Sequence, residues 1–341
     1  MQKRIVTLGL QGGGSHGAFT WGVLDRLLED ARIDIEGISG ASAGAMNAVV
    51  CAHGFAIGGR DGARQALQDF WEAVAYKAPF HSMSEDTSPL VGEGLQASTG
   101  PALKAFLFLT RFFSPYQLKP FDVNPLRDIL ASQIDFERLR SDCKMKLFIA
   151  ATRVSTGTLK LFRTKELTLD ALLASACLPT LHHSIEIDGE AYWDGGLTAN
   201  PPILPLLYQC SSSDVVLVLL HASPTQHTPR TADDIAERLS EISFSSSLST
   251  ELQAISLAQQ QAARDWYALG RHQRKLRSLH LHSIDSPEFM GQLSSLSKAR
   301  REYSLIRALR NEGRNQAGMW LEKNLHLIGV RSTLNPDQLP P

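Results

Sequence analysis

The chain has 341 residues, of which 43% are hydrophobic and 20% charged, and its formal net charge is −1. These values are typical of a globular protein with a substantial core, and they exclude a general electrostatic attraction to nucleic acid or to a membrane. Four cysteines have neither metal-ligand nor redox spacing, so we expect reduced thiols and no metal: Cys51, Cys143, Cys177 and Cys210.

Membrane-spanning and targeting segments are not expected. No apolar segment approaches the roughly 20 residues that a membrane-spanning helix needs. The apolar run before Gln11 is too short for a signal peptide. We therefore expect a cytoplasmic protein that can lie peripherally on a membrane.

The N-terminal residues predict a βαβ unit. Residues 4–10 form an apolar run without a helical period, which indicates a strand. A glycine-rich segment (residues 12–17, the glycine loop) leads into residues 18–30, where apolar residues recur at helical spacing. Residues 33–38 are β-branched and indicate a second strand. This order predicts a right-handed βαβ unit with a parallel sheet.

The glycine loop alone is compatible with two functions. Gly12, Gly14 and Gly17 fit the GxGxxG dinucleotide fingerprint, and Asp34 and Glu36 lie roughly 20 positions further on. An oxyanion hole uses the same physics, since backbone N–H groups can approach an anion only where side chains are absent. The second strand favours the oxyanion hole, because it leads directly into a serine turn and places the two loops side by side.

The serine turn is Gly40-Ala41-Ser42-Ala43-Gly44, which has the form GxSxG. A serine between a strand and a helix projects its hydroxyl outward, and the flanking glycines keep Cβ atoms out of the crowded turn. The start of the following helix, at Ala43, offers free N–H groups to an oxyanion. The same pentapeptide is compatible with a small-residue turn that only lets a helix lie flat on a strand.

The middle of the chain predicts an amphipathic helix over 61–76, an irregular stretch over 79–101 and a short helix over 102–113. The short helix is apolar on nearly all sides and too short to span a bilayer. It is therefore either packed in the core or placed as a lid or acyl-chain wall. In the second case four side chains are expected to contact a membrane: Phe106, Leu107, Phe112 and Phe113.

Further elements follow in chain order. Asn124 and Pro125 are suited to the N-cap and first position of a helix. The other expected elements are a hairpin over 146–154 and 158–163, a helix over 167–177, a strand over 185–193, a buried parallel strand over 215–220, helices over 232–270 and 293–324, and a late strand over 277–284.

Asp194 is the candidate general base, because it ends a predicted strand and is followed by Gly195 and Gly196, which allow a tight turn. A serine hydroxyl is a poor nucleophile until a base takes its proton. A carboxylate can serve only where burial raises its pKa. An ordinary Asp-Gly turn is the structural alternative. A triad of Ser42, Asp194 and His221 is the competing catalytic arrangement, since His221 follows the strand at 215–220.

Together the glycine loop, the serine turn and Asp194-Gly195-Gly196 resemble the patatin-like phospholipase family over roughly residues 4–220. The resemblance implies a three-layer α/β/α sandwich with a mainly parallel central sheet. It also implies a Ser42–Asp194 dyad that acts on lipid acyl esters without a metal or cofactor. His16 departs from the family, where many members carry Arg or Lys, so a preference for anionic phospholipid is left open. The implied oxyanion loop comprises Gly12, Gly13 and Gly14.

We therefore expect a catalytic core over 1–224 and a mostly helical extension over 225–341 that packs on the core and returns one strand. The predicted function is hydrolysis of fatty-acyl esters, as by a phospholipase A, lysophospholipase or esterase, with no nucleic-acid partner. The alternatives are acyl transfer to an acceptor other than water, a lipid-binding regulatory module on the same scaffold, and a non-hydrolytic nucleotide-binding protein.

Overall fold

The structure is a computed structural model that describes residues 3–76, 114–118, 124–220, 228–264, 270–293, 297–298, 300 and 302–334. The predicted helix over 102–113, with its four candidate membrane-contacting side chains, lies outside the described residues, as does His221. No helix in the described part of the chain is long and apolar enough to cross a membrane.

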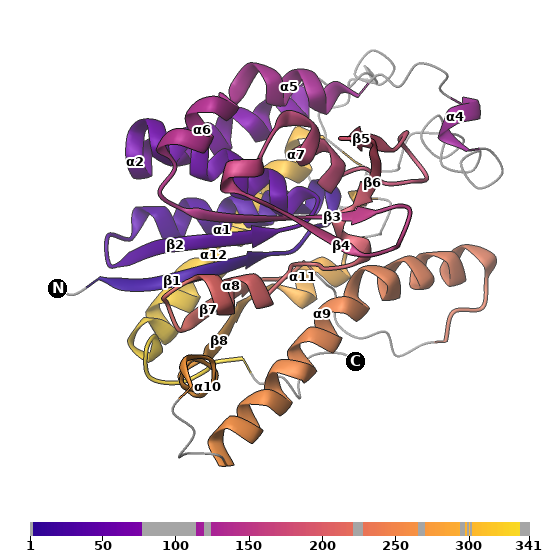
Figure 1. Ribbon diagram of the computed structural model, residues 1–341. Coiled ribbons are helices and arrows are strands. Elements are labelled where there is room, and N and C mark those ends of the chain that lie inside the picture. The colour runs from indigo at the N-terminus through magenta and orange to yellow at the C-terminus, as the bar shows by residue number, and fades with distance from the viewer. Residues whose placement is uncertain are drawn as a thin grey trace.

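A single twisted sheet forms the centre of the molecule (Figure 1). Its strand order is β5-β6-β3-β2-β1-β7-β8, with β4 paired to β3. The five parallel strands are β1 (Arg4–Leu10), β2 (Ile33–Gly40), β3 (Lys146–Arg153), β7 (Asp214–Val218) and β8 (His280–Ile284). The antiparallel strands are β4 (Leu159–Arg163), β5 (Ile185–Ile187) and β6 (Glu190–Asp194).

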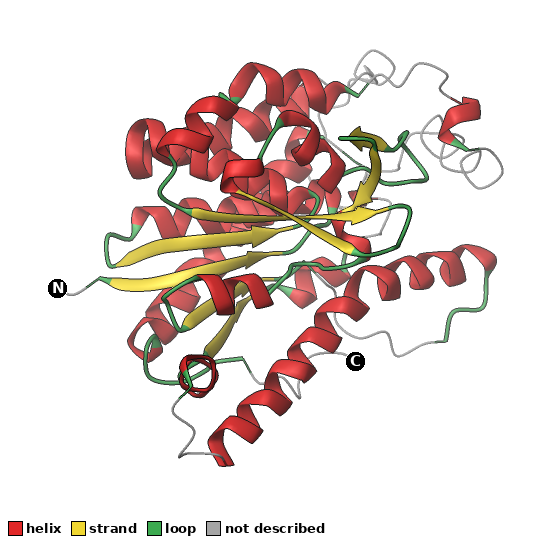
Figure 2. Cartoon of the chain, viewed as in Figure 1, coloured by secondary structure: helices red, strands yellow, loops and turns green. Residues whose placement is uncertain are grey.

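Helices cover both faces of the sheet (Figure 2). One face carries α1 (Gly17–Glu29), α2 (Ala43–Tyr76), α5 (Pro125–Gln133), α6 (Phe136–Asp142), α7 (Leu169–Ser175), α11 (Pro287–Gly291) and α12 (Tyr303–Asn324). The other carries α8 (Leu204–Gln209), α9 (Ala232–Arg264) and α10 (Arg271–Arg277). The short α4 spans Pro115–Leu118. This arrangement confirms the predicted layered α/β fold.

The strand sequences explain the two cores. Residues alternate between the faces of a strand. In β7, Val216 and Val218 therefore pack on the α1 side, while Val215 and Leu217 pack on the α8 side. A strand covered on both faces must be apolar throughout, which is why its sequence shows no polar alternation.

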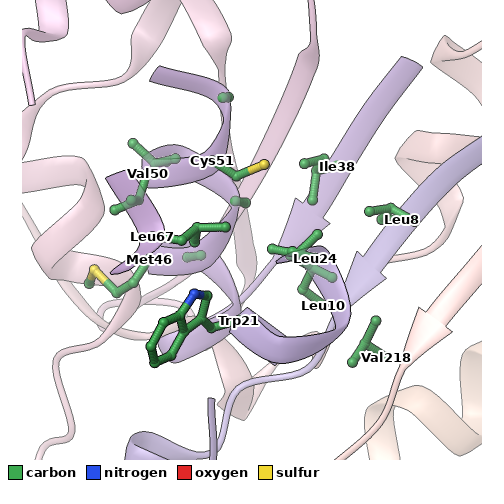
Figure 3. Packing of buried hydrophobic residues seen from close by; sticks show 14 of the residues in the cluster. Leu8, Leu10, Trp21, Leu24, Ile38, Met46, Val50, Cys51, Leu67 and Val218 are labelled. Carbon is green, nitrogen blue, oxygen red and sulfur yellow. The ribbon is translucent and has the colours of Figure 1, made fainter. Parts of the chain in front are cut away.

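The larger core lies between the sheet and helices α1 and α2. Figure 3 shows Leu8, Leu10 and Ile38 on their strands, with Leu24 of α1 and Cys51 of α2 on the helices that cover them. Leu8, Leu10, Ile38 and Leu24 are fully buried. The pairing of β1 with β2 brings Leu10 opposite Gly40, so the glycine loop and the serine turn leave the sheet at the same edge.

One local prediction differs from the structure. The single strand expected over 185–193 is a hairpin, because Asp188 and Gly189 both adopt positive φ (52° and 80°) and reverse the chain between β5 and β6. The two helices expected from Ala43 and over 61–76 are both present within α2, which is non-helical between them at Gly58 and Gly59. Gly59 has a φ of 62°, which kinks the helix there.

The C-terminal residues share the core of the N-terminal residues. Strand β8 adds to the sheet beside β7, and α12 packs closely on α1. The contact requires glycine on both helices: a Cβ on Gly313 would collide with the carbonyl of Phe19, and one on Gly22 would collide with the carbonyl of Arg310. Asp25, which is buried in α1, receives hydrogen bonds from Arg310 and Arg314 of α12.

Gly313→Ala is expected to lower the free energy of unfolding by about 1–3 kcal/mol, because the new Cβ has no room against α1. The matched control on the same helix is Gly318→Ala, whose Cβ would have Arg26 Nε at 3.8 Å as its nearest neighbour. It is expected to be neutral or to stabilise by up to about 1 kcal/mol. Urea unfolding measures both, and equal stabilities would contradict the close α1–α12 contact.

Candidate active site

The serine turn holds Ser42 in a conformation that few serines adopt. Its φ is 53°, in the left-handed region that favours glycine. The Ser42 amide donates to both the carbonyl (3.0 Å) and the hydroxyl (3.1 Å) of Ser175, at the end of α7. A Cβ on Gly44 would collide with the Leu10 carbonyl, and one on Gly40 would lie 2.7 Å from the Gly44 carbonyl. The flanking glycines are therefore required by the sharpness of the turn.

A buried polar cluster fixes the start of α2 behind Ser42. The Asn47 side chain donates to the carbonyls of Gly17 (2.9 Å) and Ala43 (3.0 Å), and it accepts from Trp71 Nε1 (3.0 Å). A Cβ on Gly17 would lie 2.7 Å from the Ala43 Cβ. The first turns of α1 and α2 are thus held in contact, which fixes the glycine loop relative to the serine turn.

The glycine loop lies directly against the nucleophile candidate. A Cβ on Gly12 would lie 2.7 Å from the Ser42 Cβ. The Gly12 amide is already used, since it donates to Asn200 Oδ1 at 2.7 Å. Within the described residues, the amides of Gly13, Gly14 and Ala43 have no acceptor. The candidate oxyanion donors therefore narrow from four amides to these three.

Asp194 ends β6 and is completely buried. Its Oδ1 accepts from the Gly196 amide at 2.7 Å, and its backbone carbonyl accepts from the Thr152 hydroxyl at 2.8 Å. Its Oδ2 is buried and has no aligned hydrogen-bond partner among the residues that the structure describes. A Cβ on Gly195 would collide with the Ala150 carbonyl, so this position requires glycine for β6 to reach the site.

Burial raises the pKa of Asp194 to about 7, although the Gly196 amide and the Ser42 side chain both stabilise the charged form. The Ser42 hydroxyl thus lies close enough to the carboxylate to stabilise its negative charge, but it forms no aligned hydrogen bond with Oδ2. A carboxyl group that titrates near neutral pH beside a hydroxyl is suited to general-base chemistry.

His16 supplies no positive charge to the glycine loop. Its side chain is 3% exposed, and Nε2 lies 2.6 Å from the Ser297 hydroxyl. Burial, with the nearby Lys298, lowers the pKa of His16 to about 3. The imidazole is therefore neutral at physiological pH and offers no charge to an anionic head group.

The acidic residues needed by the dinucleotide interpretation have other partners. Glu36 accepts hydrogen bonds from the Ser211 amide and from Lys146, and Asp34 forms an ion pair with Arg60. Both acids lie in the first half of β2, away from the end that leads into the serine turn. Across the described ranges, no group of three or more His, Cys, Asp or Glu could hold a metal ion.

Three residues that touch this site are not among the sequence candidates: Ser175, Asn200 and Phe244. The Ser175 side chain accepts a hydrogen bond from the Ser42 amide, and the Asn200 side chain accepts one from the Gly12 amide. The Phe244 ring packs on Gly196, where a Cβ would lie 2.6 Å from it. Ser175 lies in the helix predicted over 167–177, and Asn200 follows Asp194-Gly195-Gly196 closely in the chain. No periodicity or motif in these segments predicts the contacts of either side chain. The site of Phe244 on α9 depends on tertiary packing alone.

Comparison with known proteins gives a family match. A family model described as patatin-like phospholipase matches residues 8–207. VipD of Legionella pneumophila is 15% identical, with a TM-score of 0.42, over 93% of this chain and 66% of its own. ExoU, in the heterodimeric ExoU–SpcU complex of the Pseudomonas aeruginosa type III secretion system, is 16% identical, with a TM-score of 0.39, over 95% of this chain and 52% of its own. This chain thus spans less than two thirds of either protein, and no curated protein sequence matches it.

Asp194→Asn is expected to change how stability depends on pH. Burial raises the pKa of Asp194 in the folded protein to about 7, from an ordinary value of 3.8 in the unfolded chain. The contribution of this group to the free energy of unfolding is therefore fully present below about pH 4 and is lost as pH rises through 7. Asparagine does not ionise, so the stability of Asp194→Asn relative to wild type should rise by roughly 3–4 kcal/mol between pH 4 and 8.

Denaturant unfolding at both pH values measures this difference. Asp188→Asn, at an exposed turn, is the matched control and should differ from wild type equally at both. If the difference in free energy of unfolding between Asp194→Asn and wild type does not change with pH, the Asp194 carboxyl group is not costly to ionise in the folded protein, and the raised pKa is contradicted.

Proposed function

The chain belongs to the patatin-like phospholipase family, and from this premise we propose that it hydrolyses fatty-acyl esters of lipids, with Ser42 as nucleophile and Asp194 as general base. The observation that carries the proposal is the buried Asp194 carboxyl group, titrating near neutral pH within electrostatic reach of the Ser42 hydroxyl.

In the first step, Asp194 takes the proton of the Ser42 hydroxyl while the oxygen attacks the ester carbonyl carbon. The tetrahedral intermediate collapses, the ester C–O bond breaks, and the leaving alcohol takes the proton from Asp194. An acyl ester of Ser42 remains. A water molecule then gives its proton to Asp194 and attacks the acyl group. The second collapse releases the fatty acid and returns the proton to Ser42.

The developing oxyanion is proposed to bind the amides of Gly13, Gly14 and Ala43, which have no acceptor among the described residues. Ala43 begins α2, so the helix dipole also favours negative charge at this point. Amides fixed by their surroundings need no reorganisation as charge develops, and removing one such donor typically costs about 10²–10³ in rate. The buried cluster around Asn47 is what holds two of the elements carrying these donors together.

Turnover is expected to depend on Ser42 and Asp194. With p-nitrophenyl esters of increasing acyl length, wild type should cleave the longer chains, and Ser42→Ala and Asp194→Asn should lose at least about 10³–10⁴ in kcat/KM. His221→Ala tests the triad alternative and should remain active. All variants are checked for folding by thermal melting.

Equal loss of activity in His221→Ala would replace the dyad with a triad. Folded wild type without Ser42-dependent turnover would contradict the hydrolase proposal. Consumption of ester without release of fatty acid, when an alcohol acceptor is present, would indicate acyl transfer in place of hydrolysis.

The activity is also expected to depend on pH. Because Asp194 must be deprotonated to accept the serine proton, kcat/KM should rise with pH through an apparent pKa of about 7 and then reach a plateau. Initial rates between pH 5 and 9, with the melting temperature recorded at each pH, measure this profile. An activity that is constant over this range, or that falls as pH rises through 7, would contradict Asp194 as the base.

A further inference from the structure

Asn200 joins the glycine loop to helix α9. It follows Asp194 on the same segment, and its side chain is 1% exposed. Its Oδ1 accepts from the Gly12 amide at 2.7 Å, and its Nδ2 donates to the Phe244 carbonyl at 3.1 Å. One buried amide group thus contacts both the loop beside Ser42 and the helix that begins beyond residue 228.

These two partners fix the direction of the Asn200 side chain. A backbone N–H can only donate and a backbone carbonyl can only accept. The Asn200 oxygen must therefore face Gly12 while its nitrogen faces Phe244. The reversed orientation would place a donor against the Gly12 N–H and an acceptor against the Phe244 carbonyl. The contact with α9 therefore determines that an acceptor is presented to the glycine loop.

The hydrogen bond to Gly12 lies next to the amides that the proposed reaction needs. It holds the Gln11–Gly12 peptide, one residue before the Gly13 amide, while the Gly13 and Gly14 amides have no acceptor among the described residues. A loop with several adjacent N–H groups can turn any of them toward an anion. Because Asn200 Oδ1 binds the Gly12 amide, the Gly13 and Gly14 amides are the N–H groups of this loop that can bind an oxyanion.

Helix α9 also contacts the other half of the site. The Phe244 ring lies against Gly196, where a Cβ would approach it to 2.6 Å, and the Gly196 amide holds Asp194 Oδ1. The same turn of α9 therefore supports both the glycine loop, through Asn200, and the segment that carries Asp194.

We propose that Asn200 is a positioning residue that holds the glycine loop in its oxyanion-binding conformation and makes this conformation dependent on α9. This inference rests on the proposed acyl-ester hydrolysis. Asn200 itself does not contact the reacting atoms; it acts through Gly12.

Amide hydrogen exchange in wild type, followed by NMR of glycine-labelled protein, tests the anchor without any variant. The Gly12 amide should exchange at least about tenfold more slowly than those of Gly13 and Gly14, because within the described ranges the first has a side-chain acceptor and the other two have none. Equal exchange of the three amides would overturn the proposal, even if every Asn200 variant failed to fold.

Asn200→Leu tests the consequence for the reaction. It should lower kcat/KM by about 10–100-fold, since small displacements of positioning groups have effects of this size. It should raise the inhibition constant of a trifluoromethyl ketone, which forms a tetrahedral oxyanion on serine, by the same factor. Binding of a non-hydrolysable ether lipid should not change. A merely structural loss of active protein would not produce this split between the two ligands.

Thr7→Val is the matched control, because Thr7 is also fully buried. The substitution removes one hydrogen bond, which the Thr7 hydroxyl donates to the Asp214 carbonyl at the start of β7. It should keep wild-type kcat/KM. Folded Asn200→Leu with unchanged activity, inhibitor binding and Gly12 exchange would overturn the role of Asn200 and leave the hydrolase proposal intact. Wild type without Ser42-dependent turnover would instead remove the proposed function itself.

Discussion

The parallel pairing of β1 with β2 is the constraint on which the candidate site depends. Because Leu10 lies opposite Gly40, the segments that follow the two strands leave the sheet together and must pass each other at close range. A Cβ at Gly12, Gly40 or Gly44 would meet backbone or Ser42 atoms within 2.7 Å or collide outright. The glycines are therefore required by packing, and the approach of the loop amides to Ser42 is a consequence of that packing.

At Asp194, stability and the proposed function would place opposite demands on the carboxyl group. A buried carboxyl group is costly to ionise when one of its oxygens, as here, has no partner in the part of the chain that the structure describes, and this cost raises its pKa to about 7. The same cost makes the carboxylate a stronger base toward a serine hydroxyl at neutral pH. The polar contacts that would lower the cost, such as a second hydrogen bond to Oδ2, would also weaken the base.

Much of this arrangement can be predicted from sequence because its signals are local. The apolar runs of β1 and β7, the N-cap at Asn124 and the serine turn each depend on a few adjacent residues. The contacts of Asn200 and Phe244 cannot be predicted this way, since they join residues 188 and 44 positions apart with no shared pattern. The β5–β6 hairpin does have a local signal, because Asp188-Gly189 is a two-residue turn sequence that favours positive φ, but the strand-like alternation that continues through it predicts a single strand.

The proposed function requires Ser42 to be a nucleophile that its surroundings activate. Peptide mapping by mass spectrometry tests this requirement after the folded protein reacts with a long-chain fluorophosphonate, which modifies activated serines. We expect one adduct per chain, on the peptide that contains Ser42, and much slower labelling in Asp194→Asn. Adducts on other serines only, or folded protein that is not labelled, would contradict it.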